Sequence, residues 1–167
     1  YDLLNRLTRR EIAPGPGVAA DTTFEEFQYD GLSHLVSAKN DSTVVARDHD
    51  SLGRITRETL NGKAATAAFD GVGNELQLIY PGGRVVSRAY DELNRVKTIS
   101  DAGGTIATYA YVGPERVEQR DAGNGTRAHF DYDGLTGVPN ATGDFGVTRM
   151  IRSRHTRLAD ATGLDDR

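Results

Sequence analysis

The sequence repeats at a spacing close to 21 residues, and this period constrains the fold more than any other feature. Its marker is an aromatic residue, which in most copies is followed by Asp. Successive markers are 28, 20, 20, 21, 21 and 21 residues apart. The longer first interval contains Pro14-Gly15-Pro16-Gly17, which predicts a loop insertion at about residues 13–20. The markers are Tyr1-Asp2, Tyr29-Asp30, His49-Asp50, Phe69-Asp70, Tyr90-Asp91, Tyr111 and Tyr132-Asp133.

The residues after each marker have the chemistry of a turn. Asp2, Asp50 and Asp91 are each followed, three residues later, by Asn or Gly. An Asp side chain accepts hydrogen bonds from the backbone two residues on, and Asn or Gly tolerates a positive φ. A second turn signal, such as Asn61-Gly62, lies about 12–14 residues after each aromatic residue. Each repeat therefore carries two turns.

The stretches between the turns are typical of strands. Residues 54–60, 75–80 and 95–100 are rich in Thr, Val, Ile and Tyr, and apolar residues alternate with polar ones. The pattern predicts an all-β fold, with two antiparallel strands per repeat joined into a continuous hairpin meander. Strands lie about 4.8 Å apart, so one repeat advances the sheet by roughly 9.6 Å. We expect the marker rings to stack on one another as a ladder along one face.

Composition limits the core and the partners. Leu, Ile, Val and Phe together make up 36 of the 167 residues, just above the roughly 20% below which disorder is expected, so the core is predicted to be thin. The net charge of −4 gives no basic field for nucleic acid or anionic lipid. No apolar run has the length of a membrane span, and the absence of Cys excludes disulfides, thiolate zinc sites and cysteine nucleophiles. The N-terminus lacks the pattern of a signal peptide, and we expect the chain to be a fragment of a longer protein.

The recurring sequence Tyr-Asp-x-Leu-Asn/Gly-Arg followed by an apolar residue, as at residues 90–96, resembles the YD repeat of Rhs (rearrangement hot spot), teneurin-type and toxin-complex cocoon proteins. The resemblance covers residues 1–135. It departs from the pattern at Tyr111, which is followed by Val112, although Arg116 and Val117 stay in register. The resemblance implies a β-sheet shell wound as a spiral of hairpins. We predict a YD-repeat array over residues 1–135 and either a further partial repeat or a frayed tail over residues 136–167.

The resemblance also implies a function. In bacterial relatives such shells enclose a C-terminal toxic domain, and in animal relatives the shell belongs to an adhesion ectodomain. We therefore predict a structural segment that encapsulates and helps deliver a toxin domain, with that domain and the rest of the parent chain as partners. The alternative is a cell-surface adhesion or carbohydrate-binding protein with a glycan or receptor as partner. Both imply a secreted or cell-surface location, reached through a bacterial secretion system or toxin complex in the first case.

Few residues suggest chemistry. His34, His49, His129 and His155 are the only imidazoles, and His49 occupies a marker position, so we interpret it as structural. No signature of a nucleophile elbow, phosphate-binding loop or zinc protease occurs. We predict no enzyme activity, no catalytic residue, no cofactor and no metal. The alternative hypothesis is metal- or acid-dependent hydrolysis by Asp121, Asp131 and Asp133. A basic cluster is interpreted as a solvated edge strand, the alternative being contact with phosphate groups; it consists of Arg149, Arg152, Arg154, His155 and Arg157.

Overall fold

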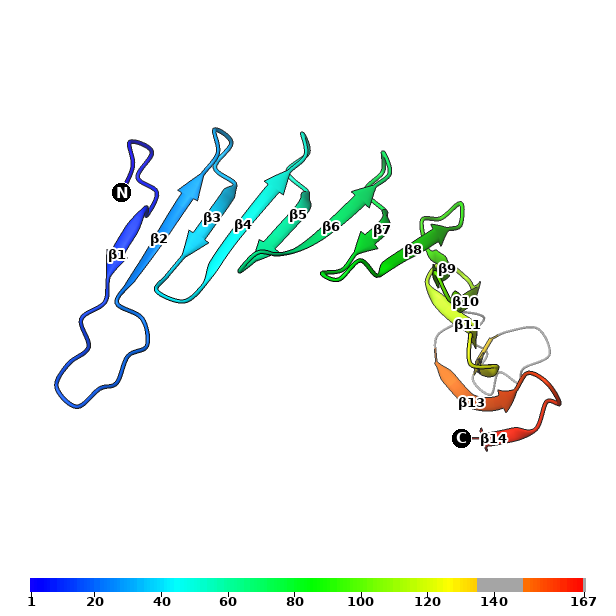
Figure 1. The fold of residues 1–167 in the computed structure, drawn as a ribbon. Coiled ribbons are helices and arrows are strands. Elements are labelled where there is room, and N and C mark those ends of the chain that lie inside the picture. The colour runs from blue at the N-terminus through cyan, green and yellow to red at the C-terminus, as the bar shows by residue number, and fades with distance from the viewer. Residues whose placement is uncertain (135–148, 167) are drawn as a thin grey trace. The chain divides into compact units, whose positions relative to one another are not determined.

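The computed structural model describes residues 1–134 and 149–166, and in these ranges all regular secondary structure is β-strand (Figure 1). In these ranges fourteen strands follow one another in the sheet in chain order, and the strand pairs within residues 1–69 and within residues 85–134 and 149–166 are antiparallel. The all-β prediction and the antiparallel hairpin meander are therefore confirmed. The described residues contain no helix that could span a membrane. The strands are β1 (Arg9–Glu11), β2 (Phe24–Tyr29), β3 (Leu35–Lys39), β4 (Val44–His49), β5 (Ile55–Leu60), β6 (Lys63–Phe69), β7 (Glu75–Ile79), β8 (Val85–Tyr90), β9 (Val96–Asp101), β10 (Gly104–Val112), β11 (Arg116–Ala122), β12 (Thr126–Tyr132), β13 (Met150–Arg157) and β14 (Gly163–Asp166).

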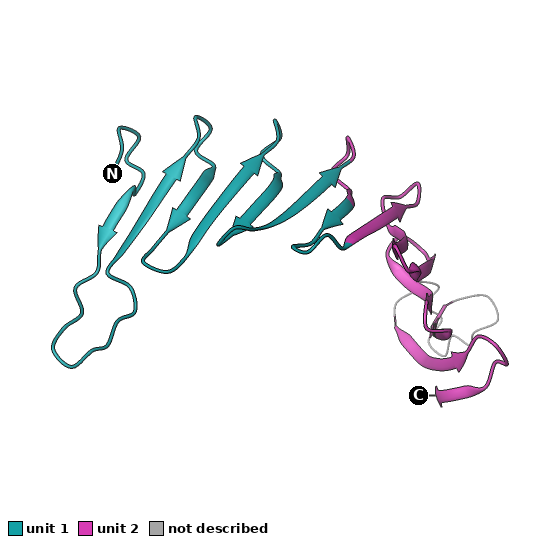
Figure 2. Ribbon diagram, viewed as in Figure 1, with its two compact units in different colours: residues 1–69, 77–84 teal, residues 70–76, 85–167 magenta. Residues whose placement is uncertain are grey.

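The chain divides into two compact units (Figure 2). Unit 1 consists of residues 1–69 and 77–84, and it contains β1 to β6 with most of β7. In it, β1 pairs with β2, and the pairing continues strand by strand to β6. The loop insertion predicted at about residues 13–20 lies between β1 and β2, outside any strand.

Unit 2 consists of residues 70–76 and 85–167. It contains β8 to β14, and each strand from β8 onward pairs with the next one in the chain. The prediction of a partial repeat or frayed tail falls partly on residues 135–148, which lie outside the described residues. Within the described part of the tail, β13 pairs with β12 on one side and with β14 on the other. The interpretation of its basic residues as an edge strand is therefore wrong.

An irregularity in strand register recurs directly before the marker residue. It is found where β2, β4, β8, β10 and β12 reach Tyr29, His49, Tyr90, Tyr111 and Tyr132. A bulge places two residues opposite one, which locally shifts the alternation of side chains between the faces of the sheet. These five marker residues therefore occupy equivalent positions at the ends of their strands.

The turns have the backbone geometry that the sequence predicts. The residue three positions after the marker Asp has a positive φ at Asn5 (58°), Gly53 (78°) and Asn94 (60°). Ser33 adopts the same conformation, with a φ of 70°. The turn at Asn61-Gly62 has φ values of 47° and 80°, and it joins Leu60 directly to its partner Lys63. These positive φ values explain why Asn and Gly recur at fixed places in the repeat.

The core is thin, as the composition predicts. Among the described residues only Val86, Ala107, Ala128 and Tyr132 are buried hydrophobic residues, and all four lie in unit 2. No polar or charged residue of the described chain is buried. Because so little apolar surface is enclosed, contacts between neighbouring hairpins carry a large share of the stability, as in other repeat arrays.

We expect replacement of Asn61-Gly62 by Val-Val to open the β5–β6 hairpin at a cost of about 2–3 kcal/mol, because β-branched residues resist positive φ. The change also removes the Asn61 Oδ1 acceptor, which lies 2.7 Å from the Val44 amide on β4. Amide hydrogen exchange of β5 and β6 measures the effect. Asn61→Asp is the matched control, since Asp-Gly supports the same turn. Unchanged protection of β5 and β6 in the Val-Val variant would contradict the prediction.

Candidate functional site

The marker Asp closes its own turn through one carboxylate oxygen. Asp91 Oδ1 accepts hydrogen bonds from the backbone amides of Leu93 at 2.9 Å and Arg95 at 3.0 Å. The Asp91 amide in turn donates to the carbonyl of Arg95. The same carboxylate bonds are made by Asp2, Asp30, Asp50 and Asp70. The second carboxylate oxygen remains available for a side chain.

That second oxygen binds the Arg four residues later. The Nε of Arg95 donates to Asp91 Oδ2 at 2.7 Å, and Arg6 and Arg54 make the same bond to Asp2 and Asp50. The guanidinium then extends to the next turn of the array. One of its terminal nitrogens donates to the Gly113 carbonyl at 2.7 Å in the case of Arg95, and Arg6 reaches the Asp30 carbonyl at 2.9 Å. The Arg side chain thus connects one turn to the next.

The same guanidinium lies over the next marker ring. The Cζ of Arg95 is 4.4 Å from the ring centroid of Tyr111, and the corresponding distance from Arg6 to Tyr29 is 4.8 Å. Arg54 over Phe69 and Arg116 over Tyr132 repeat this contact. The tyrosine hydroxyl donates back to the strand that follows the Arg, as from Tyr111 to the Val96 carbonyl at 2.7 Å. Tyr29 and Tyr132 donate to the carbonyls of Leu7 and Val117, each the residue directly after the Arg, and Tyr90 donates to the carbonyl of Glu75, which follows Asn74. We call this set of Asp, Arg and the next ring the repeat junction.

The predicted ladder of directly stacked marker rings is wrong for these Arg-containing junctions. A guanidinium lies over the next ring there, and the ring contacts found among the described residues are His34 with His49 and Tyr109 with Tyr111. Strands two apart in a sheet are separated by roughly 9.6 Å, whereas paired rings need centroids at about 4.5–7 Å. The Arg fills that gap.

The junction after Asp30 departs from this arrangement. His34 occupies the position of the Arg, and its Nδ1 lies 2.9 Å from Asp30 Oδ2. The next marker is His49, whose ring is stacked on that of His34 with centroids 4.9 Å apart. The sequence pattern places His49 in the marker series but does not indicate its contact with His34. The signal in the sequence was the spacing, because His34 follows Asp30 by the same four residues as Arg6 follows Asp2.

The acidic residues considered for hydrolysis are each paired with a basic residue. Asp121 binds Arg127 through Nε at 2.6 Å and through a terminal nitrogen at 2.8 Å. Asp131 contacts both His129 and Arg154. Asp133 Oδ1 accepts a hydrogen bond from the Arg149 amide at 2.9 Å, and Asp133 Oδ2 lies 3.6 Å from the Arg149 Nε. The geometry therefore does not favour a shared acid site.

The basic residues of β13 also have acidic neighbours. Arg154 pairs with Asp131, Arg157 with Asp160, and His155 lies 3.9 Å from Asp165. These pairs offset the positive charge that a phosphate-binding surface would need.

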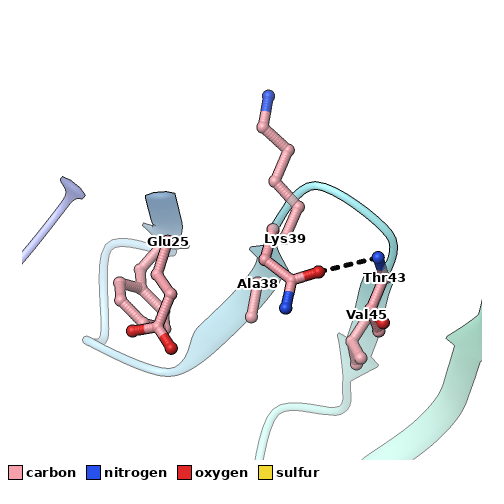
Figure 3. A pocket seen from close by; sticks show the side chains of 7 residues that line it. Glu25, Ala38, Lys39, Thr43 and Val45 are labelled. Atoms are coloured by element: carbon pink, nitrogen blue, oxygen red, sulfur yellow. Dashed lines mark hydrogen bonds between the residues drawn. The ribbon is translucent and has the colours of Figure 1, made fainter. Parts of the chain in front are cut away.

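A shallow pocket lies over β2, β3 and β4 (Figure 3). Its volume is about 120 Å³, which equals only a few water molecules. At its rim, Asn40 Oδ1 accepts a hydrogen bond from the Thr43 amide at 2.8 Å. The pocket brings together Lys39 and Glu25 with apolar side chains, which is not an arrangement for catalysis.

The marker carboxylates and Asp121 make stability dependent on pH. A hydrogen bond from the Arg95 side chain lowers the pKa of Asp91, and one from Arg127 lowers the pKa of Asp121. A carboxyl group with a lowered pKa in the folded state stabilises the fold above its ordinary value near 3.8, and this contribution is lost as the pH falls through the folded-state pKa. We expect the urea midpoint to be constant from neutral pH to about pH 5 and to fall steeply below about pH 4. Asp91→Asn is expected to flatten part of that fall, and an unchanged pH profile would contradict the assignment.

Comparison with known proteins agrees with the repeat. Residues 69–106 match the family model described as RHS Repeat. No curated protein matches the sequence significantly. The match at residues 69–106, together with the structural likeness below, confirms the resemblance to Rhs-repeat proteins.

The fold is similar to parts of solved Tc toxin structures. A Photorhabdus luminescens Tc holotoxin pore aligns with a TM-score of 0.70 and 15% identity over 92% of this chain and 8% of that chain. A crystal structure of TcdB2-TccC3 aligns with a TM-score of 0.71 and 14% identity over 92% and 9% of the two chains. A third, of TcdB2-TccC3-Cdc42, gives a TM-score of 0.71 and 13% identity over the same shares. At these identities the likeness shows the fold alone, and the present chain spans less than a tenth of the length of those chains.

Proposed function

We propose that this chain is a structural segment of an Rhs-repeat β-shell that encloses a C-terminal toxin domain and helps to deliver it. The observation that carries the proposal is the repeat junction. In the Arg-containing junctions, Asp, Arg and the next ring join one hairpin to the next through side chains of the array itself. A structural shell needs contacts of this kind between its repeats along its whole length, whereas a catalytic domain needs a cluster of reactive groups.

The likeness to Tc toxin structures supports the proposal that the shell encloses a toxin domain. On this proposal the partners are the remaining repeats of the parent chain and a toxin domain, and the assembly is secreted as part of a toxin complex. We also propose that the marker residues act in the junction and not in chemistry. Residues 1–135 are proposed as the array, with the tail continuing it.

Limited proteolysis of the parent chain tests enclosure. A toxin domain inside the shell is expected to be cleaved much more slowly than the same domain expressed separately. A parent chain whose junctions are opened by Arg6→Ala, Arg54→Ala and Arg95→Ala is expected to lose that protection. Equal rates of cleavage for the toxin domain in the parent chain and for the same domain expressed separately would refute the proposal.

Surface adhesion through sugar stacking is less well supported. Of the marker rings only Tyr1 is exposed, and Tyr29, Phe69 and Tyr111 have a guanidinium against one face. A glycan array is the discriminating measurement. Binding by the wild-type chain that is lost in Tyr90→Ala would replace enclosure with carbohydrate recognition as the better hypothesis.

A further inference from the structure

We propose that Asp30, His34 and His49 bind a divalent transition-metal ion, Zn²⁺ being the best match to these ligands. Each residue offers one ligand atom, and the three atoms lie within 4.8 Å of one another. Two imidazole nitrogens and one carboxylate oxygen are a ligand set that zinc accepts. Ligands at about 2.0–2.2 Å from a tetrahedral ion lie roughly 3.4 Å apart. Because imidazole lone pairs lie in the ring plane and the two rings are stacked at an interplanar angle of 27°, ion binding requires the His34 and His49 rings to turn out of their stack so that the lone pairs converge.

The substitution of both partners in this junction is the first support. In the other junctions the first position is held by Arg, or by Asn74 after Asp70, and the second by Tyr or Phe, as in Arg6 with Tyr29 and Arg95 with Tyr111. Arginine does not ligate metals in proteins because it stays protonated, whereas a neutral imidazole offers a lone pair. Among the residues that the structure describes, this is the one group of three potential ligands found together.

The state of His49 is the second support. Its Nδ1 is buried and has no hydrogen-bond partner within the described part of the chain. A buried polar atom without a partner is costly, and ligation of the ion through this nitrogen would satisfy it. The ring is already held close to the other ligands by its stacking on His34.

The surrounding backbone orients the other two ligands. Asp30 Oδ1 accepts from the amides of Leu32 and His34, both at 2.8 Å, which turns Oδ2 toward the imidazole. Gly53 leaves room for the His34 ring, since a Cβ at that position would lie 2.8 Å from its Nε2. Fixing of ligands by neighbouring groups is typical of built metal sites. About a third of the Asp30 and His34 side chains remains exposed, so an ion and a completing water have access.

The bound ion would link two successive repeats in place of the Arg. His34 belongs to the turn after one marker, and His49 is the next marker. The metal would therefore stabilise this junction only when zinc is present, whereas the Arg-containing junctions need no ion.

Isothermal titration of the folded full chain with ZnCl₂ tests the proposal. We expect binding of one ion and a rise in melting temperature with zinc concentration. Asp30→Asn and the double variant His34→Arg/His49→Tyr are expected to weaken binding by more than about tenfold. The double variant supplies the common Arg and Tyr pair, so it is expected to fold, and circular dichroism checks this. His129→Asn is the matched control, expected to leave binding unchanged because His129 pairs with Asp131 outside the cluster.

Imidazole NMR spectra of the wild-type chain give a readout that does not depend on variants. Zinc is expected to shift the signals of His34 and His49 and to leave those of His129 and His155 in place. Shifts of equal size at all four histidines, wild-type affinity in the double variant, or no binding at millimolar zinc would each overturn the proposal.

Discussion

Replacing Arg95 by alanine is expected to lower the free energy of unfolding by about 2–4 kcal/mol. This is a large effect for a side chain that is not fully buried. Arg95 makes an ion pair with Asp91, a hydrogen bond to the Gly113 carbonyl and a contact with the Tyr111 ring. All of these contacts lie within unit 2. The loss is larger than for an ordinary surface ion pair because one side chain serves two turns at once.

Graded variants separate the parts of this effect. Arg95→Lys keeps the charge but loses the planar fork, so we expect it to recover less than half of the loss. Tyr111→Phe removes only the hydroxyl bond to the Val96 carbonyl and should cost about 1 kcal/mol. Lys97→Ala, at an exposed position on β9, is the matched control. Urea denaturation measures all four variants, and an Arg95→Ala effect no larger than that of Lys97→Ala would show that the junction contributes little.

The hairpins and turns could be predicted from the sequence because their determinants are local. Asp91 and Asn94 lie three residues apart, and the turn needs only a carboxylate that caps nearby amides and a residue that accepts positive φ. The same argument located Asn61-Gly62 at a hairpin end. The period of the sequence then fixed the strand order, because a meander places consecutive hairpins side by side.

The junction could not be predicted because it depends on how far side chains extend between repeats. The series of marker rings suggested direct stacking, and nothing local to Tyr111 indicates that Arg95 covers it. The contact of His34 with His49 joins residues from successive repeats, and the register shift before His49 helps to set it. The strand spacing is common to all β-sheets, but identifying the contact also needs the position of that register shift, which the sequence pattern did not indicate.

Gly123→Ala is the other change for which we expect a large effect, about 2–4 kcal/mol or local unfolding of the adjoining hairpins. Gly123 follows β11, and its amide donates to the Ile106 carbonyl of β10 at 2.7 Å. A Cβ added there would lie 2.1 Å from the Thr105 carbonyl oxygen and 3.2 Å from its carbon, and both are backbone atoms that cannot rotate away.

The glycine at 123 is therefore required by close approach of two strands and not by a positive φ. Gly71→Ala is the matched control, since its added Cβ meets nothing within 4 Å and its φ is not positive. Gly71→Ala is expected to change the free energy of unfolding by less than about 1 kcal/mol. The added methyl group meets no neighbour, so its main effect is to reduce the conformational entropy of the unfolded chain. Urea denaturation together with amide exchange of β10 and β11 measures both variants. Equal changes in the free energy of unfolding for Gly123→Ala and Gly71→Ala would contradict this prediction. They would mean that Gly123 and the Thr105 backbone are further apart in solution than in the structure.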